Sequence, residues 1–203
     1  MMKQTMYRGI LIAALLVISA KPVLAADVFN RPGPYLGLGI AGGLSEFSGA
    51  ARGAEDSIGF NFRGGYRFND YYAIEGLYEY MDEFAKKVKG PLGNKFKADI
   101  GTNNFSLMGK VILPTLGLSQ LQPFLAGGIG FLEASGTGKL QIGNAKFHGG
   151  GGETEFAGRV DGGADYFFTP EISTFFDLGY VIPTEKFDNL HYLSLSAGVK
   201  YNF

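Results

Sequence analysis

Two histidines and a few serines are the residues of this sequence whose types suit nucleophilic catalysis. His148 precedes the glycine run 149–152, where a flexible loop would position an imidazole poorly. His191 and Ser194 are three residues apart, so in a β-strand, whose side chains alternate between two faces, they lie on opposite sides. Ser196 shares the parity of Ser194. The sequence therefore predicts no histidine–serine pair and no enzyme.

Metal and cofactor chemistry is not indicated either. The chain has no cysteine, which excludes disulfides, thiolate metal sites and a lipid anchor on an N-terminal cysteine. No metal-ligand spacing recurs, and the abundant glycines alternate within apolar segments instead of forming a phosphate-binding turn between a strand and a helix. We expect no metal and no cofactor.

Charged residues of both signs recur at alternate positions of apolar segments, and we expect them on one inward face. Arg63 and Arg67 precede the turn Asn69-Asp70 and Glu75 and Glu79 follow it, so we expect salt bridges across neighbouring strands, because unpaired buried charges are costly. The set forms a static polar plug or, alternatively, a gate whose pairs exchange partners to admit small ions. The ten residues, five of each sign, are Arg63, Arg67, Glu75, Glu79, Lys110, Arg159, Asp161, Asp165, Asp177 and Lys200.

A second group of charges is entirely basic and falls in a segment expected to be an external loop. It is either a solvated surface or an anion-binding loop for the phosphates of lipopolysaccharide or an anionic host polymer. Its members are Lys86, Lys87, Lys89, Lys95 and Lys97.

Period-two alternation predicts eight strands of a length that crosses a membrane. Segment 57–68 is the clearest example, with Ile58, Phe60 and Phe62 alternating with Gly59, Asn61 and Arg63. The expected strands are 35–44, 57–68, 71–81, 99–113, 123–133, 155–167, a segment between 171 and 182, and 191–203. The predicted fold is an all-β, eight-stranded, antiparallel up-and-down transmembrane β-barrel.

The composition of the two faces decides between lipid and water outside the barrel. A soluble barrel such as a lipocalin shows the same alternation, but its apolar face would have to fill the lumen. Here the charged face is also the glycine-rich face, which suits a narrow interior, so the aromatic face looks outward into lipid. Residues expected in the interfacial aromatic girdles are Tyr35, Tyr66, Phe68, Tyr71, Tyr72, Tyr80, Phe167, Phe168, Tyr180, Tyr201 and Phe203.

The N-terminal segment has the pattern of a secretory signal peptide. Lys3 and Arg8 precede the apolar run 10–20, and Val23-Leu24-Ala25 is a small-residue cleavage site. We expect residues 1–25 to be removed and residues 26–203 to form one barrel domain. Without Lys3, Arg8 and Lys21 the chain keeps 15 basic and 19 acidic residues, a net charge of −4 that does not suit nucleic-acid binding.

Connection lengths predict the orientation of the barrel. The connections after the second, fourth and sixth strands are short, whereas 45–56, 82–98, 134–154 and 182–190 are longer. Because outer-membrane barrels have short periplasmic turns and long external loops, we expect both termini in the periplasm.

The chain resembles the OmpA-type family of small outer-membrane β-barrels. The resemblance spans the mature chain and rests on Tyr35-Leu-Gly-Leu-Gly-Ile40, Tyr71-Tyr-Ala-Ile-Glu75, Gly127-Gly-Ile-Gly130 and Leu195-Ser-Ala-Gly-Val-Lys-Tyr-Asn-Phe203. It implies that Val199, Tyr201 and Phe203 form the signal read by the barrel assembly machinery. Longer members carry a peptidoglycan-binding domain after the barrel, and that tethering role is not implied here.

The functional hypothesis is a structural and surface-interaction protein of the bacterial outer membrane. We expect a monomer whose four external loops contact lipopolysaccharide, host or cell-surface ligands. The alternative is a narrow gated pore for small solutes or ions, and a third possibility is a lipid A-modifying enzyme of the deacylase or palmitoyltransferase type.

Overall fold

The computed structural model describes residues 29, 31–45, 57–89, 95–113, 119–142, 145–184 and 191–203. For the strand residues 45, 83–89, 95–99, 137–142 and 145–150 it describes the backbone alone. The described residues include no helix of the length and apolarity needed to span a bilayer. The predicted signal peptide, 1–25, lies outside the described residues.

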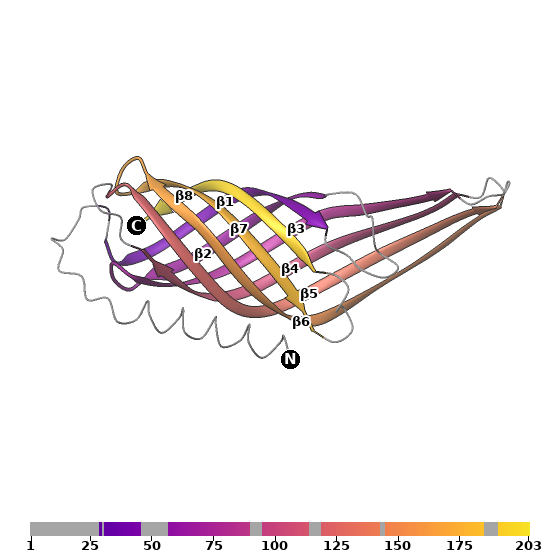
Figure 1. Ribbon diagram of the computed structural model, residues 1–203, viewed down its shortest axis with the longest axis horizontal. Coiled ribbons are helices and arrows are strands. Elements are labelled where there is room, and N and C mark those ends of the chain that lie inside the picture. The colour runs from indigo at the N-terminus through magenta and orange to yellow at the C-terminus, as the bar shows by residue number, and fades with distance from the viewer. Residues whose placement is uncertain are drawn as a thin grey trace, which may run out of the picture.

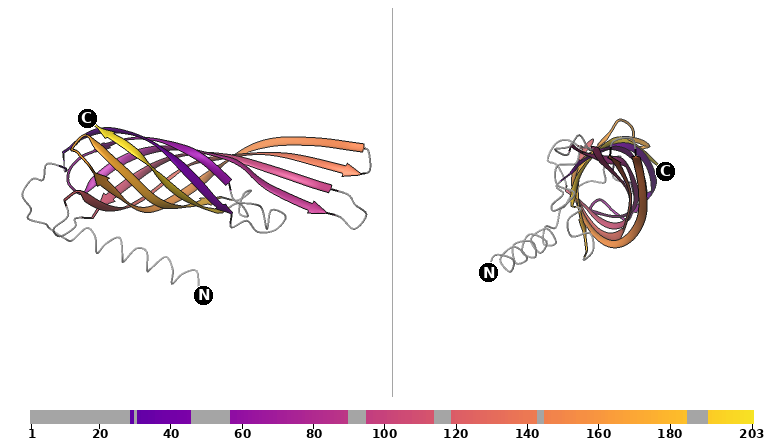
Figure 2. Two further views of the ribbon diagram at one scale, coloured as in Figure 1. Left: turned by 90° about the horizontal axis from the view of Figure 1, so that it is seen from above. Right: turned by 90° about the vertical axis from the view of Figure 1, so that its right-hand side faces the viewer.

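Eight antiparallel strands close into a barrel in which each strand pairs with its neighbours in sequence and β8 pairs with β1 (Figures 1 and 2). This confirms the predicted architecture. The strands are β1 (Gly33–Ser45), β2 (Ser57–Arg67), β3 (Tyr72–Lys89), β4 (Lys95–Ile112), β5 (Leu121–Ile142), β6 (Ala145–Phe167), β7 (Ile172–Pro183) and β8 (Tyr192–Asn202).

One end of the barrel, the short-turn end, holds the tight turns β2–β3 and β6–β7 together with the start of β1 and the end of β8. Asn69 Oδ1 accepts hydrogen bonds from the backbone N–H groups of Tyr71 (2.8 Å) and Tyr72 (2.9 Å), which fixes the first turn. Thr169 Oγ1 accepts one from Ile172 N (3.1 Å) in the second. Both turns coincide with those predicted from the sequence.

At the opposite end, β3, β4, β5 and β6 run on past the other four strands. The last β2–β3 pair is Gly59 with Met81, and the last β6–β7 pair is Ala157 with Pro183. Beyond them, 82–89, 95–101, 135–142 and 145–156 form a four-stranded sheet, here called the extension, which continues along the barrel's long axis (Figures 1 and 2). The expected loops 82–98 and 134–154 were therefore wrong for most of their length.

The reason for this error is that strand prediction relied on alternation between lipid and lumen. Outside the membrane band neither environment is imposed, and cross-strand backbone hydrogen bonds suffice to continue the sheet. The register shifts between Met81 and Phe84, as at a β-bulge, where β3 leaves the barrel wall.

Alternate residues point out of and into the barrel as predicted. The outward side chains include Leu38, Ile58 and Val160, which are 61 %, 77 % and 56 % exposed. Along β6, outward Tyr166 and Phe156 are ten residues apart, which corresponds to a height of about 25 Å for a strand tilted by about 40°. This matches the apolar band of an outer-membrane barrel.

Two residues assigned to the aromatic girdles lie inside instead. Tyr35 is 6 % exposed and Phe167 is 4 % exposed. Tyr35 shares the parity of inward Gly37, and Phe167 shares that of inward Asp165, so strict alternation would have placed both correctly.

Inward glycines provide the space that large interior side chains occupy. A Cβ atom on Gly39 would lie 2.6 Å from Phe175 Cζ, and one on Gly198 would lie 2.5 Å from the same atom. Two glycines on adjacent strands thus leave room for one buried ring, which explains the small residues on the inward face.

Candidate functional site

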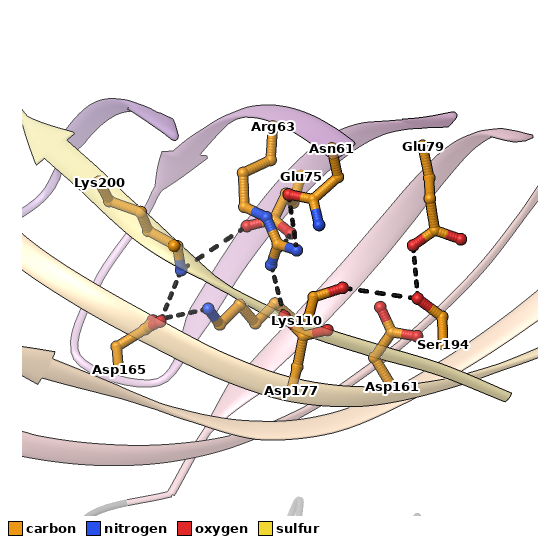
Figure 3. Close-up of polar contacts among 12 residues, drawn as sticks. Asn61, Arg63, Glu75, Glu79, Lys110, Asp161, Asp165, Asp177, Ser194 and Lys200 are labelled. Atoms are coloured by element: carbon orange, nitrogen blue, oxygen red, sulfur yellow. Dashed lines mark hydrogen bonds and ion pairs between the residues drawn. The ribbon is translucent and has the colours of Figure 1, made fainter. Parts of the chain in front are cut away.

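The interior of the barrel contains all ten charged residues singled out from the sequence. They come from β2, β3, β4, β6, β7 and β8, and each is at most 7 % exposed. Figure 3 shows side chains from different strands, among them Lys200, Asp165 and Lys110, meeting inside the lumen. Nine of the ten charged residues form two clusters, described below from the short-turn end, whereas Arg67 has other partners.

The first cluster surrounds Asp165 on β6. Its carboxylate accepts hydrogen bonds from Lys110 Nζ at 2.7 Å and Lys200 Nζ at 2.6 Å (Figure 3). Lys200 Nζ also lies 4.0 Å from Glu75 Oε2. The Lys110 ammonium sits 3.5 Å from the centroid of the Phe124 ring, a cation–π contact that stabilises a buried cation away from water.

Arg63 extends this cluster toward the middle of the lumen. Its Nη1 donates to Asp177 Oδ2 at 2.8 Å and lies 3.5 Å from Glu75 Oε1. Its guanidinium stacks 3.7 Å from the centroid of Phe175. Tyr35 donates from its hydroxyl to Glu75 Oε2 at 2.9 Å, so the carboxylate has partners on three strands. Lys110, Lys200 and Arg63 balance Asp165, Glu75 and Asp177 in formal charge.

The second cluster centres on Arg159, nearer the extension. Arg159 binds Glu79 through two parallel hydrogen bonds, Nη1 to Oε1 at 3.0 Å and Nη2 to Oε2 at 3.1 Å. Its Nε donates to Asp161 Oδ1 at 2.8 Å. Tyr192 and Ser194 on β8 donate their hydroxyls to the same Glu79 carboxylate, at 3.1 Å and 2.6 Å. Such bidentate geometry holds the side chains in one arrangement.

The pairing expected across the β2–β3 turn occurs in part. Arg63 contacts Glu75 as expected, but Glu79 is bound by Arg159 from the far wall. Arg67, at the short-turn end, donates to Gln122 Oε1 at 2.8 Å and to the backbone carbonyl of Asn69 at 3.0 Å. Sequence neighbours alone could not give these partners, because side chains in a narrow lumen reach across it.

Several interior residues that shape the clusters were not identified from the sequence. Phe124 and Phe175 were overlooked because they stand beside conspicuous outward hydrophobic residues, although each shares the parity of inward charged or small residues. Tyr192, whose hydroxyl binds Glu79, is the third such residue. Parity was the available signal in all three cases.

Ser194 and His191 have separate partners in the described residues. Ser194 donates to Glu79, whereas the His191 ring stacks on Tyr180 at a centroid distance of 5.9 Å and an angle of 11°. The His148 side chain lies outside the described residues. Among the described side chains, no group of three or more metal-ligating residues lies together.

The five lysines predicted as an anion-binding loop lie on strands. Lys86, Lys87 and Lys89 are in β3, and Lys95 and Lys97 are in β4; their side chains are outside the described part of the structure.

The expected assembly signal is on β8 and at its end. Val199, Tyr201 and Phe203 are 59 %, 50 % and 66 % exposed on the outward face, and the Tyr201 and Phe203 rings pack edge to face at 4.9 Å.

Open space at the short-turn end is small. A hollow of about 40 Å³ is lined by Phe29, Tyr35 and Arg67, and a second of about 20 Å³ by Lys110 and Asp165 among others. These volumes admit a few water molecules. The structure is thus a closed barrel with an apolar exterior and an interior packed with charged side chains. These two features define an integral membrane barrel.

Comparison with known proteins identifies the family. The chain belongs to the outer membrane protein β-barrel domain family, whose model matches residues 10–203. It is accordingly an integral β-barrel of the bacterial outer membrane. A comparison with curated protein sequences gives no significant match.

Solved structures with the same fold share little sequence with this chain. Neisserial surface protein A is 18 % identical, with 84 % of this chain and 97 % of that chain covered and a TM-score of 0.60. OprG of Pseudomonas aeruginosa is 16 % identical, with 87 % and 99 % covered and a TM-score of 0.60. Ail, the attachment invasion locus protein of Yersinia pestis, is 14 % identical, with 85 % and 99 % covered and a TM-score of 0.56, in a complex with the heparin analogue sucrose octasulfate.

Proposed function

We propose that this protein is a surface-interaction protein whose barrel anchors the β3–β6 extension outside the cell, where the extension binds ligands. The observation that carries the proposal is the continuation of four strands past the last pairs Gly59–Met81 and Ala157–Pro183. A regular sheet positions side chains more rigidly than separate loops do, which suits recognition of a partner.

The two ends of the barrel support an orientation in which the extension lies outside the cell. The tight turns and both ends of the described chain share the short-turn end, which in outer-membrane barrels faces the periplasm. The extension then faces outward. Cleavage after Ala25 would leave a short segment before Phe29 on the periplasmic side.

The interior supports an anchoring role over transport. Hydrogen bonds between non-adjacent strands close both ionic clusters, and the rings of Phe124 and Phe175 lie against cations of the first cluster. Ail, whose name refers to attachment, has the same fold and was crystallised with a heparin analogue, which supports a binding role for this barrel.

Trimming the extension tests the proposal. Deleting 85–99 and 137–150 and closing each hairpin with Asn-Gly removes most of the extension and keeps the barrel wall. We expect bacteria that express the trimmed protein to lose attachment to immobilised extracellular matrix, while the barrel still shows a heat-dependent mobility shift on gels. A control replaces 185–190 by Asn-Gly and keeps the extension. Equal attachment by trimmed and full-length protein would contradict the proposal.

A narrow pore is the second candidate, and one observation favours it. Among the described residues, Asn61 Nδ2, Asn104 Nδ2 and Asp177 Oδ1 are buried and have no hydrogen-bond partner within the protein. Water inside the lumen would satisfy these atoms. A reproducible conductance in planar bilayers, altered by Arg63→Ala or Glu75→Ala, would support the pore. We expect no such conductance.

Lipid A modification is tested separately by overexpression. We expect the mass of lipid A to stay unchanged, because Ser194 and His191 have other partners in the described structure.

A further inference from the structure

The backbone register of the extension brings distant lysines together. Lys87 pairs with Lys97, Lys97 with Lys139, and Lys139 with His148, so these four positions form one row across the four strands. A second row, two residues nearer the hairpin ends, contains Lys89, Lys95, Gln141 and Lys146. Positions in a row, and rows two residues apart, share one face of a sheet.

This face, here called the lysine face, continues the outward face of the barrel. On β4, positions 95 and 97 have the parity of Phe105, which is 56 % exposed; the pairing of β4 with β5 is regular throughout. The opposite face of the extension carries a row of different character: Val88, Phe96, Leu140 and Phe147. The sequence thus alternates basic and apolar positions along these strands.

The charge of the lysine face is concentrated and almost unopposed. Its two rows hold six lysines, and the next row toward the barrel adds one carboxylate, Asp99, next to Ala85, Thr137 and Gly150. The whole chain, in contrast, has a net charge of −1. Neighbours in a row are about 4.8 Å apart and the rows about 6.7 Å apart.

Such an arrangement is unfavourable for the isolated sheet. Like charges directly opposite each other on antiparallel strands destabilise the pair, and Lys87–Lys97, Lys97–Lys139 and Lys89–Lys95 are three such pairs. A bound polyanion would offset the repulsion in all three pairs together. The register therefore points to a ligand with several closely spaced negative charges.

The height of the lysine face above the membrane determines which anions it can contact. Tyr78, Phe105, Phe131 and Phe156 form one outward row, which marks the interfacial girdle at this end. Lys97 is eight residues beyond Phe105 on β4, which corresponds to about 26 Å of strand and a height of about 20 Å even at a tilt of about 40°. Lipid headgroup phosphates lie near the girdle, so a lysine side chain does not span this gap. The ligand must come from outside the membrane.

From this placement we infer that the lysine face binds a sulfated polysaccharide chain. The inference rests on the proposed surface-interaction function and names its ligand class and site. Each lysine is a compact point charge that suits a tetrahedral sulfate, and the segments 82–101 and 135–156 contain no arginine that would favour planar bidentate partners. A linear chain laid across both rows engages several lysines at once.

The test measures heparin binding to the full-length barrel in phosphatidylcholine vesicles, which contain no lipid A. The test variant is Lys87→Gln/Lys97→Gln/Lys139→Gln, three positions in one row. The matched control is Lys86→Gln/Arg52→Gln/Lys186→Gln: Lys86 belongs to the row with Ala98 and Gly138 on the other face, and Arg52 and Lys186 are outside the extension. Both variants remove three positive charges. The heat-dependent gel shift restricts the comparison to folded protein.

We expect the test variant to weaken heparin binding at least about tenfold and the control about twofold or less, with wild-type affinity falling as salt rises. Equal weakening by both variants would overturn the assigned site, because binding would then follow total charge. Equal affinity for duplex DNA and heparin would overturn the assigned ligand class.

Suppose that the wild-type protein does not bind heparin but that trimming the extension still abolishes attachment. The inference about the ligand would then be overturned, and the proposed function would stand. If attachment is also independent of the extension, the proposed function fails with it.

Discussion

Replacing Arg159 by methionine is the most direct test of the ionic interior. Arg159 makes two hydrogen bonds to Glu79, and its Nε donates to both carboxylate oxygens of Asp161; all three side chains are at most 2 % exposed. Methionine keeps much of the volume and removes the charge. Two carboxylates then remain in the lumen without the cation that contacts both of them.

The size of the effect follows from the burial of these carboxylates. Breaking a buried ion pair by removing one partner costs about 3–5 kcal/mol, because an uncompensated charge is left behind. The triple variant Arg159→Met/Glu79→Gln/Asp161→Asn removes both carboxylates as well, so we expect it to recover at least half of the lost free energy of unfolding. In that variant the amide at position 79 keeps one oxygen as an acceptor for the hydroxyls of Tyr192 and Ser194.

The assay is urea unfolding in detergent micelles, followed by the heat-dependent gel shift, for wild type and both variants. Arg31→Met serves as the control, because Arg31 is an exposed cation and its loss should change the free energy of unfolding by less than about 0.5 kcal/mol. If Arg159→Met unfolds at the wild-type urea concentration, or if the triple variant is no more stable than the single one, the ionic cluster does not stabilise the barrel as described.

Three further predictions concern packing, hydrogen bonding and the lipid face. Gly39→Ala should lower the free energy of unfolding by about 1–3 kcal/mol because the new Cβ overlaps Phe175. The control Gly42→Ala, whose Cβ would lie 4.0 Å from the nearest atom, Leu195 O, should be near neutral. Equal effects of the two substitutions in urea unfolding would refute the packing argument. Tyr35→Phe removes the donor to Glu75 and should cost about 1.5–3 kcal/mol in the same assay, and an unchanged midpoint would argue against that bond. Val160→Arg, near the middle of the outward band, should lower the free energy of unfolding in lipid vesicles by about 2–4 kcal/mol. Thr154→Arg, beyond the girdle, should lower it much less. The reverse order would place the membrane elsewhere.

Strand parity carried most of what was predicted correctly about the fold. The alternation of Phe60 and Phe62 with Asn61 and Arg63 fixed which residues face lipid, because a strand has a period of two whatever it pairs with. The tight turns at Asn69 and Thr169 were also local, since each side chain bonds to the backbone within three residues. The errors at Tyr35 and Phe167 came from weighing residue type above parity.

The extension shows the limit of local patterns. Residues 83–89 and 137–142 have no lipid to face, so their alternation of lysine and apolar residues did not meet the criterion for a membrane strand. The lysine row depends on pairing between β3, β4, β5 and β6, and a shift of one residue in any pair would place its lysines on the other face.

The sequence by itself determined the class of structure and the character of each face, because side-chain alternation and turn chemistry act over a few residues. Only the tertiary structure decided the partners inside the lumen, such as Arg159 with Glu79, and the alignment of lysines across the extension. Both depend on barrel closure and register, which bring together residues that are 42 to 80 positions apart in the chain. Contacts over such separations are set by the whole sheet and not by any one strand.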